Sequence, residues 1–188
     1  MGQFQVDKID TKNVTIKTEA RVTNINDSYL EINNDEKIAY KYLVGADGSN
    51  SIVRRYLGLK TKLAGVAIQY LIPKGEFSNL EIFFDSKLFR SWYAWIFPNK
   101  DYVSIGYGYP RKVVSSKLMT DNFNKWLKKH NINVDNAKYQ AFMINCDYRG
   151  FKFGNVFLVG DAAGLASGFT GEGIYQALVS GEDVAKII

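Results

Sequence analysis

An aspartate at the end of an apolar strand is the residue best placed for chemistry. Asp161 follows Gly160 and the apolar run Val156–Val159. Ligands of open α/β sheets bind beyond the carboxyl ends of strands, and a buried carboxylate needs hydrogen-bond partners that ligand hydroxyl groups can supply. A glycine-rich stretch, residues 168–174, then opens a helix expected at Gly171–Ile188, whose positive dipole end would stabilise negative charge. The spacing favours a site for a hydroxylated ligand, although the glycines alone are also typical of helix caps.

A second acidic turn occurs earlier in the chain. Residues 45–50 read GADGSN, after a strand expected at Tyr40–Ala46 and before a short helix expected at Ser51–Leu57. We expect Ser49 or Asn50 to cap this helix, and a helix N-terminus with free amides is an anion site. Taken alone, the motif is more typical of an ordinary turn than of a ligand site.

An aromatic strand is the third feature that could bind a ligand. Residues 91–100 read SWYAWIFPNK, so Tyr93, Trp95 and Phe97 share one face of an extended strand. Three aromatic rings in a row suit a long apolar ligand. The alternative is that they belong to the sheet core, since aromatic residues favour strands in any case.

The elements that must position these residues form a mixed α/β pattern. An amphipathic helix is expected at Ser116–His130, with Met119, Phe123, Trp126 and Leu127 on its apolar face. Short runs of apolar residues between turns predict the following strands: Val14–Lys17, Ala20–Asn24, Tyr29–Ile32, Leu63–Pro73, Leu80–Phe84, Ser91–Pro98, Tyr102–Tyr109 and Lys138–Ile144. The apolar stripe expected on the last helix consists of Ile174, Ala177, Leu178, Gly181, Ala185 and Ile188.

Composition excludes several classes of protein. The chain has 188 residues, of which 46% are hydrophobic and 23% charged, which is ordinary for a globular protein. A single cysteine, Cys146, and a single histidine, His130, argue against a disulfide scaffold, a zinc site and a Ser-His-Asp triad. We expect Cys146 to be a buried, unreactive thiol and His130 to have no catalytic role. No apolar stretch is long enough for a transmembrane helix and no secretory signal is present, so a cytoplasmic location is expected.

The positive charge is concentrated in the middle of the chain. The net charge is +5, and residues 61–150 contain 13 Lys and Arg against 7 Asp and Glu. Such an excess could attract phosphates, the anionic headgroups of a membrane surface, or nucleic acid, or it could simply be a solvated lysine-rich face. No nucleic-acid motif accompanies it, so nucleic acid is not an expected partner.

The two acidic turns, in this order, resemble the fingerprints of the glutathione-reductase-type FAD proteins, in the superfamily of aromatic hydroxylases and geranylgeranyl reductases. The resemblance covers about residues 40–188. It implies an FAD-binding, Rossmann-like fold in which Gly160 and Asp161 hold the ribityl chain of FAD. Asp47 and Gly48 would lie near the pyrophosphate, and Arg54 would support that loop. Near the flavin N1–C2=O edge, the resemblance places the start of the last helix, namely Gly171, Glu172, Gly173 and Ile174.

The aromatic strand is similar to the geranylgeranyl-reductase motif Tyr/Phe-x-Trp-x-Phe-Pro. By this resemblance Tyr93, Trp95 and Phe97 bind an isoprenoid substrate, whose carbon–carbon double bonds are reduced with electrons from an external donor. The match departs at Asn99, since the family's lysine directly follows the proline and here comes one place later, at Lys100. No catalytic residue is assigned. The alternatives are a flavin-dependent monooxygenase of the same superfamily, and a non-catalytic fragment that binds an apolar ligand or a partner chain.

One fingerprint of the family is not found. No G-x-G-x-x-G follows a strand, since Gly106-Tyr107-Gly108 lacks the third glycine. We therefore expect an internal fragment of a longer protein, with either a missing N-terminal segment or a homo-oligomer covering its strand edges. Its predicted parts are a partial FAD-binding domain, residues 1–60 and 145–188, and an antiparallel-sheet substrate domain, residues 61–144.

Overall fold

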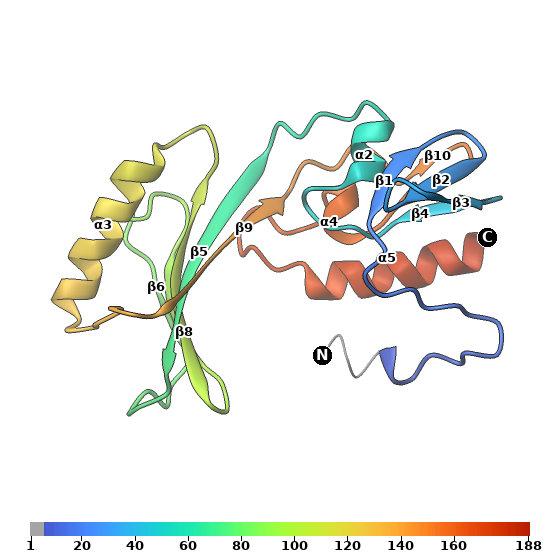
Figure 1. Cartoon of the computed structure of the whole chain (residues 1–188). Helices are drawn as coiled ribbons and strands as arrows, with labels where there is room; N and C mark the ends of the chain where they lie inside the picture. Colours follow the sequence, from blue (N-terminus) through green and yellow to red (C-terminus); the bar gives the residue numbers. More distant parts are fainter. Residues whose placement is uncertain (1–5) are drawn as a thin grey trace. The chain divides into compact units, whose positions relative to one another are not determined.

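The computed structural model describes residues 6–188 (Figure 1). They divide into two compact units, one ending at Lys41 and the other spanning Tyr42–Ile188. The division into a partial FAD-binding domain and a substrate domain stays a prediction. No helix among the described residues combines the length and the apolar character needed to cross a bilayer.

The first unit contains a three-stranded antiparallel sheet. Its strands are β1 (Val22–Ile25), β2 (Tyr29–Ile32) and β3 (Glu36–Ala39), in that order. The prediction of β2 is confirmed, β3 was not predicted, and the strand predicted at Val14–Lys17 is wrong. Alternating Val14 and Ile16 suggested a strand, but both side chains are about half exposed and the segment pairs with no strand in the described part of the chain.

The second unit begins with a small sheet that carries both acidic turns. Its order is β10 (Lys152–Phe153), β11 (Val156–Leu158) and β4 (Leu43–Gly45), with β11 and β4 parallel. Because parallel strands end at the same edge, the turns after β4 and β11 are brought together there. Three helices accompany this sheet: α2 (Ile52–Tyr56), α4 (Gly160–Ala163) and α5 (Ile174–Ile187).

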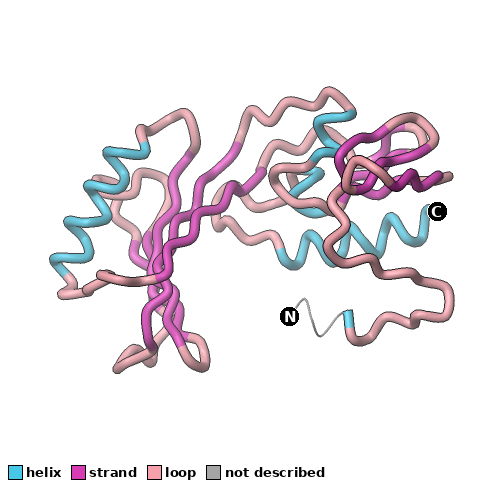
Figure 2. The backbone as a smooth tube through the Cα atoms, in the orientation of Figure 1, coloured by secondary structure: helices cyan, strands magenta, loops and turns pink. Residues whose placement is uncertain are grey.

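A five-stranded antiparallel sheet forms the rest of the second unit. In spatial order its strands are β6 (Glu81–Phe83), β7 (Ala94–Pro98), β8 (Tyr102–Pro110), β5 (Ala64–Pro73) and β9 (Lys138–Asn145). The predicted strands agree with these within a few residues. Figure 2 shows these strands lying next to one another, with the long helix α3 (Ser116–Lys129) beside them.

Helix α3 covers one face of this sheet. Its predicted apolar residues Met119, Phe123, Trp126 and Leu127 are all buried. They pack against the strand residues Ile68, Ala94, Ile96, Val103, Ile105, Tyr107 and Tyr109. This is the principal hydrophobic core of the unit, and Tyr93, Trp95 and Phe97 are not part of it.

The opposite face accommodates the predicted aromatic row. Trp95 pairs across the strands with Gly106, and a Cβ atom on that glycine would lie 2.4 Å from the indole ring. Glycine at this position therefore makes room for tryptophan. In Gly106-Tyr107-Gly108, the tyrosine between the two glycines points to the α3 side and packs in the core there. The glycines make room for Trp95 and Trp92 on the other face, so packing accounts for the G-x-G spacing and no nucleotide-binding role is needed.

The last helix packs differently from the prediction. Ile174 and Leu178 of the predicted stripe are exposed, and the buried residue of the helix is Val184, which packs with Phe157 and Val159. Apolar residues occur nearly all around α5, so their periodicity did not identify the face that packs.

Candidate functional site

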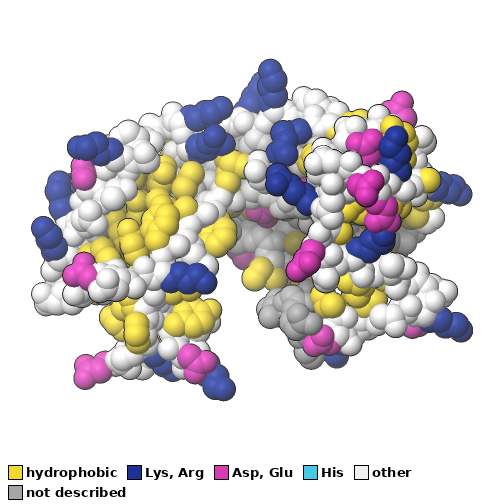
Figure 3. Space-filling view, viewed as in Figure 1, with side chains coloured by type: hydrophobic (Ala, Val, Ile, Leu, Met, Phe, Trp, Pro, Cys, Tyr) yellow, Lys and Arg dark blue, Asp and Glu magenta, His cyan; other side chains and the backbone are white. Residues whose placement is uncertain are grey.

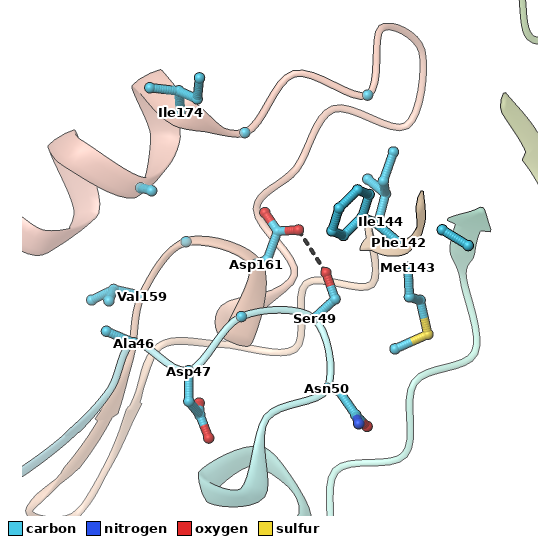
Figure 4. Close-up of a pocket in the computed structure, with 16 residues that line it drawn as sticks. Ala46, Asp47, Ser49, Asn50, Phe142, Met143, Ile144, Val159, Asp161 and Ile174 are labelled. Carbon is cyan, nitrogen blue, oxygen red and sulfur yellow. Dashed lines mark hydrogen bonds between the residues drawn. The ribbon is translucent and has the colours of Figure 1, made fainter. Parts of the chain in front are cut away.

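A cavity of about 770 Å³ lies at the edge where β4 and β11 end (Figure 4). It is lined by residues from both acidic turns, from β9 and from the start of α5: residues 46–50, residues 141–144, Val159, Gly160, Asp161, Gly171, Gly173, Ile174 and Ala177. The volume lies within the range of small-molecule and cofactor sites. Of the described residues that line it, the charged ones are Asp47 and Asp161.

Asp161 joins the two acidic turns. Its Oδ2 accepts a hydrogen bond of 2.7 Å from the hydroxyl of Ser49, as Figure 4 shows. Its main-chain oxygen accepts a bond of 2.8 Å from the side-chain amide of Asn145. The carboxylate is half-buried on the cavity wall, and Gly173 approaches so closely that a Cβ there would lie 2.8 Å from Oδ1. A carboxylate accepts more than one hydrogen bond, so Asp161 keeps capacity for ligand hydroxyl groups.

The other acidic side chain is turned away from Asp161. Oδ2 of Asp47 accepts hydrogen bonds from the amides of Ile52, at 2.7 Å, and Val53, at 3.3 Å. The hydroxyl of Ser51 accepts a third, from the amide of Arg54 at 2.8 Å. The cap of α2 is therefore Ser51, and the prediction of Ser49 or Asn50 is wrong. The predicted anion site on free amides of this helix is also wrong, since Asp47 and Ser51 occupy the amides.

Arg54 ties α2 to the turn that carries Asp161. The side chain is 2% exposed, and its Nη1 donates to the main-chain oxygen of Ala162 while Nη2 donates to that of Asp147. Burial lowers the pKa of the guanidinium, and the carboxylate of Asp147, 3.7 Å away, opposes this effect. The resemblance implied that Arg54 supports the Asp47–Gly48 loop. Its side chain instead donates to the turn after β11 and to Asp147, and the implied role stays a prediction.

Asp147 is a structural residue that the sequence did not reveal. Burial would raise the pKa of its carboxyl, but hydrogen bonds from the Lys62 amide and the Arg149 side chain, with the charges of Arg149 and Arg54, lower it overall. Because its partners come from distant segments, only the fold could identify it.

The start of α5 forms the far wall of the cavity. Gly171, Gly173 and Ile174 line it, whereas Glu172 does not. The carboxylate of Glu172 instead accepts a hydrogen bond of 2.8 Å from the amide of Tyr175, so it acts as a first-turn acid of the helix. The loop before the helix is closed by the amide of Ser167, which donates to the main-chain oxygen of Glu172.

A smaller cavity, of about 190 Å³, contains the aromatic row. Its lining residues are Ala67, Trp92, Tyr93, Trp95, Phe97, Ile144, Thr170 and Gly171, none of them charged. The hydroxyl of Tyr93 donates to the main-chain oxygen of Thr170, which links the row to the loop of the larger cavity. Burial raises the pKa of Tyr93, so this donor keeps its proton. The structure thus brings all three predicted substrate residues together beside Gly171.

Sequence reasoning missed the contribution of β9. Ala141, Phe142, Met143 and Ile144 line the larger cavity, and Phe142 is 52% exposed. A strand was predicted there, but alternation did not show which face meets a ligand. Cys146, just beyond the strand, is half-buried, and burial together with the charge of Asp161 raises the pKa of its thiol. Cys146 is thus half-buried where a buried thiol was expected, and its lack of reactivity stays a prediction. In the described part of the chain, no group of His, Cys, Asp and Glu is arranged to hold a metal ion.

Curated relatives match most of this chain. It is 34% identical over 155 residues to an uncharacterized protein of Methanosarcina barkeri, covering 78% of this chain and 39% of that protein. It is 31% identical over 166 residues to protein CbrA of Shigella dysenteriae, covering 82% of this chain and 45% of that protein. The chain therefore spans less than half the length of the curated relatives it matches.

Solved structures share the fold. A geranylgeranyl bacteriochlorophyll reductase-like protein of Thermoplasma acidophilum superposes with a TM-score of 0.71 and 22% identity, over 92% of this chain and 46% of that one. PqsL of Pseudomonas aeruginosa, described as a probable FAD-dependent monooxygenase, gives a TM-score of 0.58 and 17% identity, over 89% of this chain and 52% of that one.

A family model described as "FAD binding domain" matches residues 12–185, nearly the whole chain. The mixed α/β fold, with its parallel β4–β11 pair and its antiparallel sheet, agrees with the expected fold class. The chain belongs to this FAD-binding domain family, and its cofactor is FAD.

Proposed function

We propose that this chain provides the ribityl and flavin side of an FAD site in an oxidoreductase of the geranylgeranyl-reductase type. The observation that carries the proposal is the junction of Asp161 and Ser49 on the wall of the 770 Å³ cavity. Two distant turns are thereby joined at a half-buried carboxylate that can accept further hydrogen bonds.

Each predicted cofactor residue receives a role from its position. Asp161 accepts bonds from ribityl hydroxyl groups, with Gly160 beside it. Gly171, Gly173 and Ile174 present the start of α5 to the flavin edge, and Glu172 holds that first turn. Asp47 and Gly48 shape the turn on the pyrophosphate side, where Asp47 caps the first amides of α2. Arg54 supports the turn that carries Asp161 through its bond to Ala162.

The aromatic cavity is the proposed substrate site. When bound, the flavin supplies hydride transfer at N5. The residues of this chain then orient the substrate and exclude water: Tyr93, Trp95 and Phe97 present an uncharged aromatic wall beside Gly171. An isoprenoid chain fits such a wall, and an external electron donor would reduce the flavin. Peripheral contact with a membrane, from which such a substrate could be taken, is part of the same proposal.

A flavin-dependent monooxygenase is the second candidate, and a row of polar groups favours it. On the aromatic face, Trp95 Nε1 donates to Ser104, Ser104 donates to Gln69, and Gln69 donates to Gln140, with distances of 2.9, 2.6 and 2.7 Å. Such a row would suit a substrate with polar substituents better than a plain isoprenoid.

FAD titration of the purified chain tests the cofactor site. Asp161→Ala removes charge-assisted hydrogen bonds, worth about 1.5–3 kcal/mol, and should weaken FAD binding by about ten- to a hundredfold. Asp101→Ala removes the same charge from an exposed turn between β7 and β8 and should leave binding unchanged. Equal affinities in both variants would reject the role of Asp161.

Anaerobic reoxidation separates the two candidate reactions. Protein loaded with FAD is reduced chemically and mixed with geranylgeranyl diphosphate without oxygen. The reductase predicts flavin reoxidation with loss of a substrate double bond. Reoxidation only after oxygen is admitted, with a hydroxylated product, would favour the monooxygenase.

A further inference from the structure

A second cavity, of about 570 Å³, lies beside the first and has the opposite electrostatic character. Within residues 6–188, its lining contains no acidic side chain and five cationic ones, namely Arg54, Arg55, Lys60, Arg111 and Lys112. The two cavities share Ser49, Asn50 and Met143 as a common wall. Among the lining residues that the structure describes, the charged side chains of the first cavity are two carboxylates, and those of the second are all cations.

We propose that this basic cavity binds the diphosphate group of a ligand whose remaining part lies in the flavin cavity. The proposal rests on the proposed function for the identity of that neighbouring cavity. The ligand is either an isoprenyl diphosphate substrate or a nicotinamide dinucleotide that supplies the electrons. Both are diphosphate esters, so the same cations would recognise either.

In the described part of the chain, four of the five cations of this cavity have no acidic partner; the fifth, Arg54, lies 3.7 Å from a carboxylate oxygen of Asp147. Elsewhere on the unit, Lys117 pairs with Asp121 and Lys186 with Glu182, as exposed helical lysines commonly do. In residues 6–188 no ion pair is formed by Arg55, Lys60, Arg111 or Lys112.

Neutral groups hold the side chains of Arg55 and Arg111 in place. Nη1 of Arg55 donates to both oxygens of Asn50, at 2.7 and 3.0 Å, and Nη1 of Arg111 lies 3.1 Å from the sulfur of Met143. Each guanidinium is positioned but not neutralised, and a guanidinium matches phosphate oxygens with paired hydrogen bonds. A phosphoryl group would supply the missing negative charge.

The fold brings these cations together from two separate segments. Arg55 lies on α2 and Lys60 follows it in the loop toward β5, where dark-blue side chains gather in Figure 3. Arg111 and Lys112 directly follow β8, and the Arg111 amide donates to the main-chain oxygen of Ala64, at 2.8 Å. Lys112 has a left-handed backbone, with φ of 66°, which is uncommon for a lysine and fits a constrained functional loop.

The buried arginine supplies an independent observation. Arg54 is 2% exposed, and its Nε has no hydrogen-bond partner among the residues that the structure describes. An unsatisfied buried donor is costly. Because Arg54 also lines the basic cavity, the wall of that cavity contains a cationic side chain with one donor left unpaired.

Titration with inorganic diphosphate tests the site directly. The double variant Arg111→Gln with Lys112→Gln should bind diphosphate at least about tenfold more weakly than the unchanged chain. The matched control, Lys125→Gln with Lys128→Gln on α3, loses the same charge away from the cavity and should bind within about twofold. Lys60→Gln, a single change in the loop, should weaken binding several-fold and serves if the double variant misfolds. Absence of diphosphate binding, or equal losses in the pocket and control variants, would overturn the proposal.

Competition identifies the source of the diphosphate. Displacement of diphosphate by geranylgeranyl diphosphate assigns the cavity to the substrate, and displacement by NADPH assigns it to the electron donor; displacement by neither would overturn the proposal. FAD affinity of the pocket variant should stay unchanged, and a loss would mean that the cavity belongs to the cofactor, which would also overturn it. Because Asp161→Ala tests the flavin site separately, failure of one proposal is distinguishable from failure of the other.

Discussion

The two faces of the five-stranded sheet differ in how they use the same strands. On the α3 side, Ile105, Tyr107 and Phe123 are at most 1% exposed and the face is sealed by a helix. On the other side, Trp95 and Phe97 border a cavity, and polar Ser104 lies among them. Alternate residues along one strand therefore serve stability on one face and, we propose, ligand binding on the other.

The sealed face should respond most strongly to truncation. Phe123→Ala removes a ring stacked on Tyr107, with centroids 4.4 Å apart, and should lower the free energy of unfolding by about 3–5 kcal/mol. Phe97→Ala, on the half-open face, should cost clearly less. Urea titration followed by tryptophan fluorescence reports on this unit, since all three tryptophans lie in it. If both variants lost the same free energy of unfolding, the two faces would contribute equally to stability and the proposed difference between them would be contradicted.

The free energy of unfolding should also depend on alkaline pH, through a buried tyrosine on the α3 face. Burial raises the pKa of Tyr107 from 10.0 to about 12, with its hydroxyl 3.0 Å from that of Thr120. The unfolded chain loses this proton near pH 10 while the folded chain keeps it. Stability is therefore intact below pH 10 and falls by about 2–3 kcal/mol as the pH rises toward 12.

Replacement of the tyrosine isolates its contribution. Tyr107→Phe should flatten the pH dependence of the unfolding free energy between pH 10 and 12, whereas Tyr102→Phe, at an exposed position of the same strand, should leave it unchanged. A decline of the same steepness in Tyr107→Phe would assign the effect to other groups.

The smallest effect is expected on the ligand-facing side. Trp95→Phe keeps an aromatic ring but removes the hydrogen bond to Ser104, worth about 1 kcal/mol. We expect a loss of that order in urea titration, with FAD affinity unchanged. A loss as large as that of Phe123→Ala would mean that Trp95 belongs to the stabilising core after all.

Local patterns predicted much of this arrangement. The period of two placed Tyr93, Trp95 and Phe97 on one face, and the helical period identified the packed side of α3, because both patterns depend on neighbours in the sequence. The same patterns failed for Val14–Lys17, which had no strand to pair with, and for α5, whose apolar residues surround the helix.

Long-range contacts were beyond such patterns. The hydrogen bond between Ser49 and Asp161 joins residues 112 positions apart, and Arg54 reaches Asp147 across 93. Choosing Ser51 over Ser49 as the cap of α2 required the backbone geometry of the turn. The strand-end acids could be predicted because they follow apolar runs, but their partners depend on which strands lie side by side.

We propose that FAD binds where β4 and β11 end, beside the face of the five-stranded sheet that α3 does not cover. The most direct test of this claim is a two-dimensional amide NMR titration of the chain with FAD. We predict that the amides of Gly160, Asp161, Gly171, Gly173 and Ile174 shift, together with those of Met143 and Ile144 on β9. The amides of α3, residues 116–129, should not move. Shifts concentrated on α3, with none at Asp161 or the start of α5, would contradict the claim.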